Sequence, residues 1–231
     1  MSTTEGGGNI ITDGLLLCLD AANTKSYIGS GTTWTDLSRS SNNGTLVNGP
    51  TFSSANGGSI VFDGIDDRVN LSNNLSTSTE NSVTVEAFVW LNTNQNTKIF
   101  ISNYTQINNP TGFGLGISDS NNNIVKWFTG NLGTTNTIFS TTTLVNQQYY
   151  HVVGTYNGSV KQLYINGILE ASSSVSNGIN NTSTLASLGY LRYFNNQYFN
   201  GRISFAKTYN RALTATEILQ NYNATKTRFG L

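Results

Sequence analysis

Short runs of strand-forming residues, separated by turns rich in Asn and Gly, set the pattern of this chain. The clearest example is residues 149–170, YYHVVGTYNGSVKQLYINGILE, in which two Asn-Gly pairs separate three such runs. Asn-Gly permits positive φ at both central positions of a type I′ turn, whose twist matches the strands it joins. The stretch therefore predicts an antiparallel meander with strands over 149–156, 160–165 and 168–171.

The middle strand of this meander does not reveal which of its faces is buried. Alternate positions mix apolar and polar side chains on both faces, with Val160, Gln162 and Tyr164 on one and Lys161, Leu163 and Ile165 on the other. Both assignments stay open.

Further strand-like runs follow the same pattern and predict strands over 15–19, 59–62, 83–91, 98–102, 112–118, 124–128, 137–139, 185–191 and 201–209. Residues 21–58 are mostly turn material, and their apolar side chains are expected to anchor them to the core: Trp34, Leu37, Leu46, Val47 and Phe52. Many short strands between Gly and Asn turns predict a two-sheet sandwich or jelly roll.

One helix is predicted near the end of the chain, over roughly 214–222. Thr214 and Glu217 have the spacing of a capping box, and Leu213 and Ile218 that of a hydrophobic staple. We divide the chain into a flexible arm (1–12), a sandwich domain (13–223) and a tail (224–231). The tail either docks its apolar end on a neighbouring subunit or frays.

Composition narrows the class of partner. The chain has 231 residues, a length at which all-β sandwiches are commonly one domain. Charged residues make up only 10%, and Lys+Arg and Asp+Glu both number 12, so the net charge is zero. Nucleic-acid binding needs clustered cations and is not expected, whereas a neutral surface favours association into a homo-oligomer or larger particle.

The chain carries no signal for a membrane or for secretion. No apolar run approaches the roughly 20 residues of a membrane helix, and residues 1–8 lack the basic and apolar parts of a secretory signal. Cys18 is the one cysteine and lies in an apolar run, which favours a buried, inert thiol. We expect synthesis in a cytosol and no membrane partner.

At several places the sequence resembles the laminin G-like, concanavalin A-like family. The matching stretches occur in the expected order over residues 14–222: Asp36–Leu46 (DLSRSSNNGTL), Ile60–Asp67 (IVFDGIDD), Tyr150–Val153 (YHVV) with Leu163–Gly167 (LYING), and Gly201–Ile203 with Tyr209–Leu213 (YNRAL) and Glu217-Ile218. The resemblance implies an all-β, concanavalin A-like jelly-roll sandwich. It does not imply a function, because function depends on the site rather than the fold.

The two ends of the domain resemble a narrower group. Residues 14–23 (GLLLCLDAAN) and 221–231 (NYNATKTRFGL) resemble lectin-like domains in structural proteins of tailed bacteriophages, including phages of cyanobacteria. This implies a non-enzymatic virion protein, a capsid decoration, collar or fibre component that is assembled in the host cytoplasm and contacts its own copies and other virion proteins. The alternative is an adhesion module for host surface polysaccharide, with weak binding amplified by many copies.

A glycan hydrolase is the second alternative, and the sequence argues against it. Glycosidases need two carboxylates about 5–5.5 or 6.5–9.5 Å apart, and glucanases of this fold carry theirs on one strand as E-x-D-x-x-E. The corresponding strand here offers Glu86 alone, while Glu170 and Glu217 fall in a hairpin strand and a helix cap. His151, the one histidine, occupies a structural position of the family, so we expect a scaffold role and no enzyme activity.

Calcium is the one cofactor that the sequence suggests. Asp63, Asp66 and Asp67 place three carboxylates within five residues of a loop, and relatives often hold calcium at the rim of the sandwich. Calcium takes 6–8 oxygen ligands, so backbone carbonyls would complete the shell. The competing interpretation is a set of Asx turns in which Asp66 or Asp67 pairs with Arg68.

An aromatic and amide-rich stretch over residues 190–199 (YLRYFNNQYF) is the candidate ligand-binding loop. Its residues expected to bind are Tyr193, Phe194, Asn195 and Tyr198, joined by Trp127 and with Tyr104 as a further candidate. Sugars are bound by aromatic faces together with amide and hydroxyl groups, but exposed rings also mark protein contacts. Both readings, host glycan and protein partner, stay open.

Overall fold

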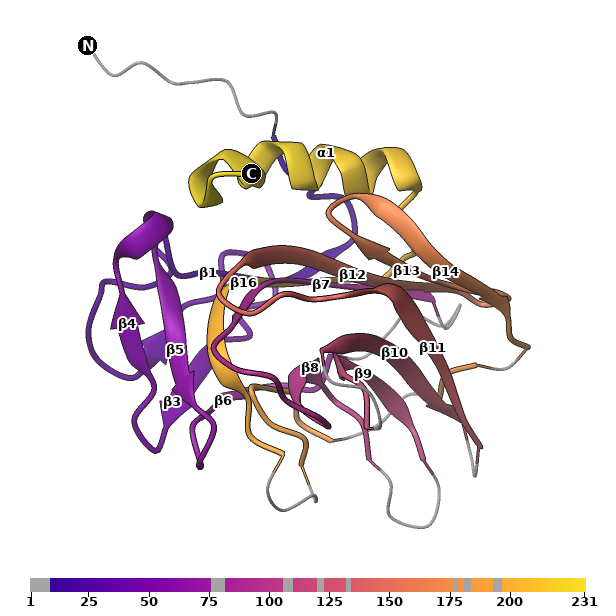
Figure 1. Cartoon of the computed structure of the whole chain (residues 1–231), viewed down its shortest axis with the longest axis horizontal. Coiled ribbons are helices and arrows are strands. Elements are labelled where there is room, and N and C mark those ends of the chain that lie inside the picture. Colours follow the sequence, from indigo (N-terminus) through magenta and orange to yellow (C-terminus); the bar gives the residue numbers. More distant parts are fainter. Residues whose placement is uncertain are drawn as a thin grey trace.

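Two antiparallel sheets pack face to face in this protein. The computed structural model describes residues 9–75, 82–105, 110–119, 123–131, 134–176, 178–180, 184–192 and 197–231. The described residues contain one α-helix. It lies on the outer face of one sheet, on the side away from the other sheet (Figure 1). The prediction of an all-β jelly-roll sandwich with a short C-terminal helix is confirmed.

Sheet A contains the meander at one edge. Its strands, in order of pairing, are β14 (Ile168–Ser174), β13 (Val160–Ile165), β12 (Tyr149–Asn157), β7 (Ser82–Leu91), β16 (Asn200–Tyr209), β5 (Ser59–Asp63) and β4 (Thr51–Ser53), with β1 (Leu15–Asp20) also pairing with β16.

Sheet B is the second layer of the sandwich. Its strands, again in order of pairing, are β11 (Thr134–Thr143), β10 (Ile124–Asn131), β9 (Gly112–Ile117), β8 (Ile99–Ser102), β15 (Ser187–Leu188), β6 (Arg68–Leu71), β3 (Gly44–Val47) and β2 (Thr33–Trp34).

The hydrophobic core fills the space between the sheets. Strand β7 shows the period of two most clearly, because its core residues are Val83, Val85, Ala87, Val89 and Leu91. The intervening residues face outward, toward the helix. In β13 the face with Leu163 and Ile165 belongs to the core. This answers which face of the middle meander strand is buried, and it means that Lys161, on the same face, also points inward.

The two Asn-Gly turns of the meander differ. Asn166 and Gly167 both have positive φ, 51° and 79°, as a type I′ turn requires. At the first pair only Gly158 does, so the prediction of a type I′ turn there is wrong. Instead the Asn157 side chain accepts hydrogen bonds from the amides of Ser159 and Val160 at 3.0 and 2.7 Å, an Asx turn that needs no positive φ at the Asn.

Residues 21–58 contain more strand than predicted, namely β2, β3 and β4. These strands are two to four residues long, too short for a periodic signal. Trp34 and Leu46 are buried as expected, but Leu37 is 36% exposed and does not anchor the segment. The neighbouring Asp36 points inward instead and binds the amides of Cys18 and Asn42.

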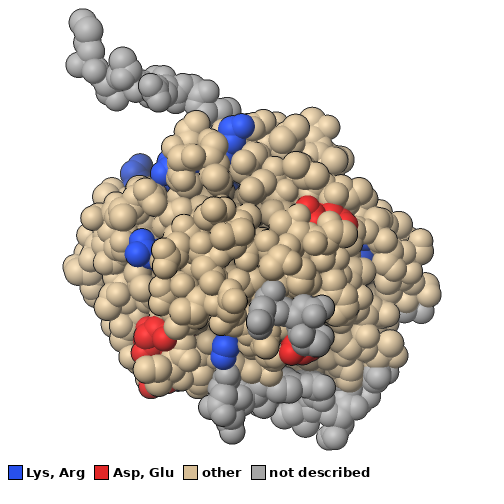
Figure 2. Space-filling model, in the orientation of Figure 1, with Lys and Arg blue, Asp and Glu red and all other residues tan. Residues whose placement is uncertain are grey.

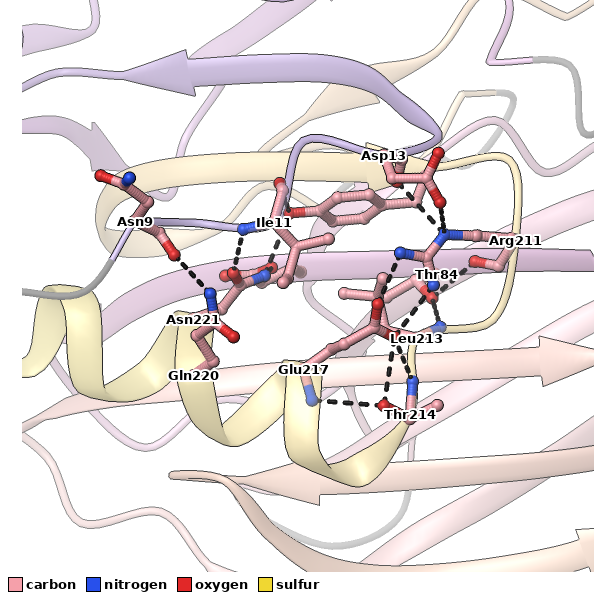
Figure 3. A network of polar contacts seen from close by, with 12 residues as sticks. Asn9, Ile11, Asp13, Thr84, Arg211, Leu213, Thr214, Glu217, Gln220 and Asn221 are labelled. Carbon is pink, nitrogen blue, oxygen red and sulfur yellow. Dashed lines mark hydrogen bonds and ion pairs between the residues drawn. The ribbon is translucent and has the colours of Figure 1, made fainter.

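The helix α1 (Ala215–Thr225) starts at the predicted capping box and runs past the predicted end. Thr214 accepts from the Glu217 amide, and Glu217 accepts from the Thr214 amide at 2.8 Å and from both terminal nitrogens of Arg211 at 2.9 and 2.6 Å (Figure 3). With eleven residues, it is too short to cross a membrane, and no described helix is long and apolar enough to do so.

The C-terminal residues 224–231 are part of the fold. They finish α1 and form a 3-10 turn, η2 (Lys226–Phe229), in which Phe229 is 7% exposed. The Phe229 ring stacks on Phe88 of β7 with a centroid distance of 3.9 Å. The expectation of a frayed or subunit-docking tail is therefore wrong for Phe229, which packs within its own chain.

The N-terminal boundary also moves. Residues 1–8 lie outside the described part, but the last residues of the predicted arm are held against the helix (Figure 3). The Asn9 carbonyl accepts from Gln220 at 2.7 Å, and the Ile11 amide donates to Asn221 at 2.8 Å. Residues 9–12, which the sequence assigned to the arm, therefore belong to the sandwich domain.

Candidate functional site

A groove lies on the outer face of sheet B, on the side of the molecule away from α1. It has a volume of about 320 Å³ and is lined by side chains of β10 and β11 together with loop residues. We call it the sheet B groove, and define it by the residues that line it: Thr97, Tyr104, Asp119, Lys126, Phe128, Thr135, Thr137, Phe139, Leu191 and Gln197.

The alternation of β9 makes room for the groove. Phe113, Leu115 and Ile117 point into the core, so the outer face of β9 carries only glycines. A Cβ on Gly114 would lie 2.2 Å from the ring of Phe128. Glycine at this position therefore lets the Phe128 ring lie flat across β9 and form the floor.

The floor is apolar and the rim is polar. Phe128 meets Tyr104 edge to face at 5.0 Å, within a small cluster that also contains Ile99 and Leu191. The Tyr104 hydroxyl bonds to Thr135 at 2.5 Å, and burial raises the pKa of Tyr104 against the effect of this bond. Phe139 is the exposed ring, with 48% of its surface open to solvent.

One ion pair stands at the rim. The Lys126 ammonium bonds to the exposed Asp119 carboxylate and lies 5.1 Å from the centroid of Phe128. The floor rings Phe128 and Tyr104 are each only 4% exposed, so the ring available for stacking is Phe139. Beside it lie a fixed cation, a carboxylate and threonine hydroxyls, and such a mixture of apolar and polar groups is typical of small-ligand sites.

Trp127 does not belong to this site. It is fully buried in the core, and its Nε1 donates to the Thr155 carbonyl of sheet A at 3.0 Å. The prediction that Trp127 binds a ligand is wrong. Strand alternation turns Trp127 inward, and it is the adjacent residues Lys126 and Phe128 that point outward into the groove. Tyr104, the further candidate, lines the groove but is only 4% exposed.

Of the predicted loop residues, Tyr193, Phe194 and Asn195 lie outside the described residues. Tyr198 is half-buried, and its ring stacks on Tyr190 with 4.9 Å between centroids. The loop ends that are described, Leu191 and Gln197, line the groove. The sequence analysis did not predict several residues that line the groove, namely Lys126, Phe128, Phe139 and the threonines of β11. The signal that was available was the run of alternate glycines in 112–116.

The three aspartates do gather. One carboxylate oxygen from each of Asp63, Asp66 and Asp67 lies within 4.8 Å of the others. One Asx turn is present, in which Asp63 accepts from the Ile65 amide at 2.8 Å, and Asp67 accepts from the Asp63 amide at 3.0 Å across the loop. Arg68 bonds to the Asp66 carbonyl instead of a carboxylate. Three carboxylates supply part of a calcium shell, and calcium here stays a prediction.

Glu86 lies on the opposite side of the molecule from the groove, sealed beneath α1. Its carboxylate contacts His151 at 2.9 Å, Lys207 at 3.0 Å and Asn221 at 2.9 Å, and its side chain is fully buried. Burial raises its pKa, but Lys207 and then His151 outweigh this and hold the pKa at about 2. An inaccessible, permanently ionised carboxylate is suited to structure and cannot protonate a substrate.

The other carboxylates considered for hydrolysis are also engaged. Glu170 bonds to the amides of Thr141 and Thr142 at 3.0 and 2.9 Å, and Glu217 caps the helix. His151 is fully buried and stacks against Tyr222, with 5.8 Å between centroids. Its scaffold role is consistent with this geometry.

Comparison with solved structures finds the same sandwich in binding domains and in glycosidases. Domain 4 of AbnA, a GH43 extracellular arabinanase from Geobacillus stearothermophilus solved with arabinotriose, superposes with a TM-score of 0.73, 15% identity and coverage of 92% of this chain and 100% of that one. The binding domain of Paraclostridial Mosquitocidal Protein 1 superposes with a TM-score of 0.70 and 17% identity, and the match covers 91% of this chain and 52% of that one. A Trypanosoma rangeli sialidase superposes with a TM-score of 0.70 and 14% identity, and the match covers 98% of this chain and 35% of that one.

At these identities the likeness shows the fold alone. No curated protein matches the sequence. A family model does: that of the concanavalin A-like lectin/glucanases superfamily (Laminin_G_3) matches residues 63–219, more than half of the chain. These residues include the strands beside the groove and, in sheet A, strands β7, β12, β13, β14 and β16. The chain therefore belongs to the concanavalin A-like lectin/glucanases superfamily.

Proposed function

We propose that this chain is a carbohydrate-binding module and that the sheet B groove holds a stretch of polysaccharide. The observation that carries the proposal is the groove itself, in which an aromatic floor of Phe128 and Tyr104 and the exposed ring of Phe139 adjoin hydroxyl, amide and charged groups. The complex of the arabinanase domain with arabinotriose supports it, because that domain has the same fold.

We propose that the module binds without cleaving. Hydrolysis needs two carboxylates flanking one bond, and among the residues that line the groove Asp119 is the single acid, paired with Lys126. Glu86 is sealed under the helix. We expect no release of reducing ends when the pure protein is incubated with a polysaccharide that it binds.

The virion role that the sequence ranked first now ranks behind carbohydrate binding. A capsid, collar or fibre location, a homo-oligomer and other virion partners stay predictions that rest on the resemblance of the chain ends. The two roles are compatible, since an adhesion module can be displayed on a particle.

The test is binding to polysaccharides by affinity gel electrophoresis, with arabinan among them. Phe139→Ala should weaken binding roughly three- to tenfold, because an aromatic contact contributes about 0.5–1.5 kcal/mol beyond its buried area. Ile168→Ala changes an even more exposed apolar residue, on sheet A (67% exposed), and is the control that should not change binding. Equal retardation of wild type and Phe139→Ala would remove the groove from the proposal.

A further inference from the structure

We infer that a second hollow on the same face binds an anionic group of the polysaccharide, so that the preferred ligand is an acidic sugar chain. The hollow has a volume of about 370 Å³. We call it the arginine hollow, and it is lined by Arg68, Asn70, Tyr190, Arg192 and Tyr198. The inference rests on the proposed function and names its substrate class.

Strand alternation places the hollow on the outer face of sheet B. In β6, Val69 and Leu71 belong to the core, so Arg68 and Asn70 point outward. Strand β6 pairs with β15, and the chain leaves β15 directly into Tyr190 and Arg192. The hollow therefore lies on the same face as the groove, farther along the sheet.

Both arginines lack a carboxylate partner within the described residues. The ion pairs there involve other cations, namely Lys126, His151, Lys207, Arg211 and Arg228. Arg68 reaches only the Asp66 carbonyl at 3.4 Å, and Arg192 reaches only the Asn70 amide oxygen at 3.3 Å. In a chain with 12 Lys and Arg in total, two such arginines line one hollow, and none of its described lining residues is an acid.

The aromatic wall indicates a sugar rather than a bare anion. The rings of Tyr190 and Tyr198 are nearly parallel, at 15°, and the Arg68 guanidinium lies 5.8 Å from the Tyr190 centroid. Tyr combines an apolar ring with a polar tip, and Arg binds carboxylate or sulfate oxygens in a two-pronged fashion. Together they suit a sugar unit that carries a carboxylate or a sulfate ester.

The hollow continues the groove. Leu191 and Gln197 line the groove, and their neighbours Arg192 and Tyr198 line the hollow. A single polysaccharide chain that crosses this segment contacts both, with one sugar against the Phe139 ring of the groove and an acidic sugar between the arginines.

The experiment compares polygalacturonate, dextran sulfate and arabinan as ligands for the full chain, by affinity electrophoresis at low and high salt. We expect at least one acidic polymer to bind more tightly than arabinan. Arg68→Gln with Arg192→Gln should weaken acidic binding roughly tenfold or more, since each bidentate contact is worth about one order of magnitude in affinity, and should weaken the binding of uncharged arabinan much less. The carboxylate and sulfate arms identify the anionic group.

Two controls separate a built site from general charge attraction. Lys25→Gln with Arg39→Gln removes the same charge from exposed positions outside the hollow, and should leave acidic binding as in the wild type. Arg68→Lys with Arg192→Lys keeps the charge but loses the planar fork, and should restore only part of the affinity. Thermal unfolding midpoints verify that all variants fold.

The outcomes distinguish the inference from the proposed function. Binding of arabinan with no preference for an acidic polymer overturns the inference and leaves the function standing. Equal loss of acidic binding in the control pair and the hollow pair also overturns it. Binding of no polysaccharide by the wild type overturns both.

Discussion

Lys161 is a charged residue that strand alternation places in the core. It shares a face of β13 with Leu163 and Ile165, and it is completely buried. Its ammonium bonds to the Asn136 carbonyl and lies 6.0 Å from the centroid of Trp127. Burial lowers the pKa of Lys161 to about 7, because transfer from water penalises the charged form.

This shift makes the stability depend on pH in a defined window. The unfolded chain protonates Lys161 below about pH 10.5 and the folded chain only below about 7. Between these values the unfolded state binds one more proton, so this group lowers stability progressively as pH falls from 10.5 to 7. The cost is complete at and below pH 7 and absent above about 10.5.

Lys161→Met should therefore stabilise the protein at neutral pH, by about 1–3 kcal/mol, since replacing a buried charge with an apolar side chain of similar size is often stabilising by this amount. Urea denaturation at pH 7 and at pH 10 measures it, and the gain should shrink at the higher pH. A variant that is less stable than wild type at pH 7 would show that the bond to Asn136 outweighs desolvation.

At the scale of elements, the contact between α1 and sheet A is polar at its centre and aromatic at its end. Glu86, His151 and Lys207 come from β7, β12 and β16, and Asn221 comes from the helix. This network joins three strands to α1. Phe229 closes the end of the contact by packing on Phe88 and Tyr149.

Glu86→Gln should destabilise the protein by about 3–5 kcal/mol, because it leaves the buried Lys207 ammonium without its counter-charge. Glu86 has a folded pKa of about 2 against 4.5 unfolded, so its stabilising effect is present above pH 4.5 and is lost as pH falls toward 2. Denaturant titrations at pH 7 and pH 3 should show a smaller difference between wild type and variant at pH 3.

A double variant measures the interaction between Glu86 and Lys207. Glu86→Gln with Lys207→Met should lose less stability than the sum of the single changes, since neither buried charge is then left alone. Glu170→Gln changes a half-buried carboxylate on the edge strand β14 and serves as the control, with a smaller loss. Strict additivity of the two single changes would refute the coupling.

Phe229→Ala should cost about 3–5 kcal/mol, as for other buried Phe residues. Leu231→Ala, two residues later and 42% exposed, should stay within about 0.5 kcal/mol of wild type. Thermal and urea unfolding of the two variants measure whether the C-terminal segment is part of the domain. Similar stability of both variants would place Phe229 outside the cooperative unit.

At the scale of the whole molecule, the sandwich has two structurally different outer faces. α1 and η2 cover part of the outer face of sheet A, while the outer face of sheet B carries the groove and the arginine hollow. The face of the molecule seen in Figure 2 carries few charged groups.

Much of this architecture was predictable from the sequence because its causes are local. A strand such as Val83–Leu91 is marked by β-branched and aromatic residues, the turn at Asn166-Gly167 by a pair that tolerates positive φ at both positions, and the helix start by the spacing of Thr214 and Glu217. The shortest strands, β2, β3 and β4, were not predictable, because they depend on pairing with neighbours rather than on their own residues.

The sequence by itself determined the class of fold, the meander, the capped helix and the absence of a paired-acid motif on Val83–Leu91. Only the tertiary structure decided which face of each strand is buried: it placed Lys161 and Trp127 inside, Leu37 outside, and Phe128 over Gly114. The physical reason is that burial depends on what the facing sheet and neighbouring strands present. A groove lined by β10, β11 and the ends of a distant loop exists only once those strands are in register.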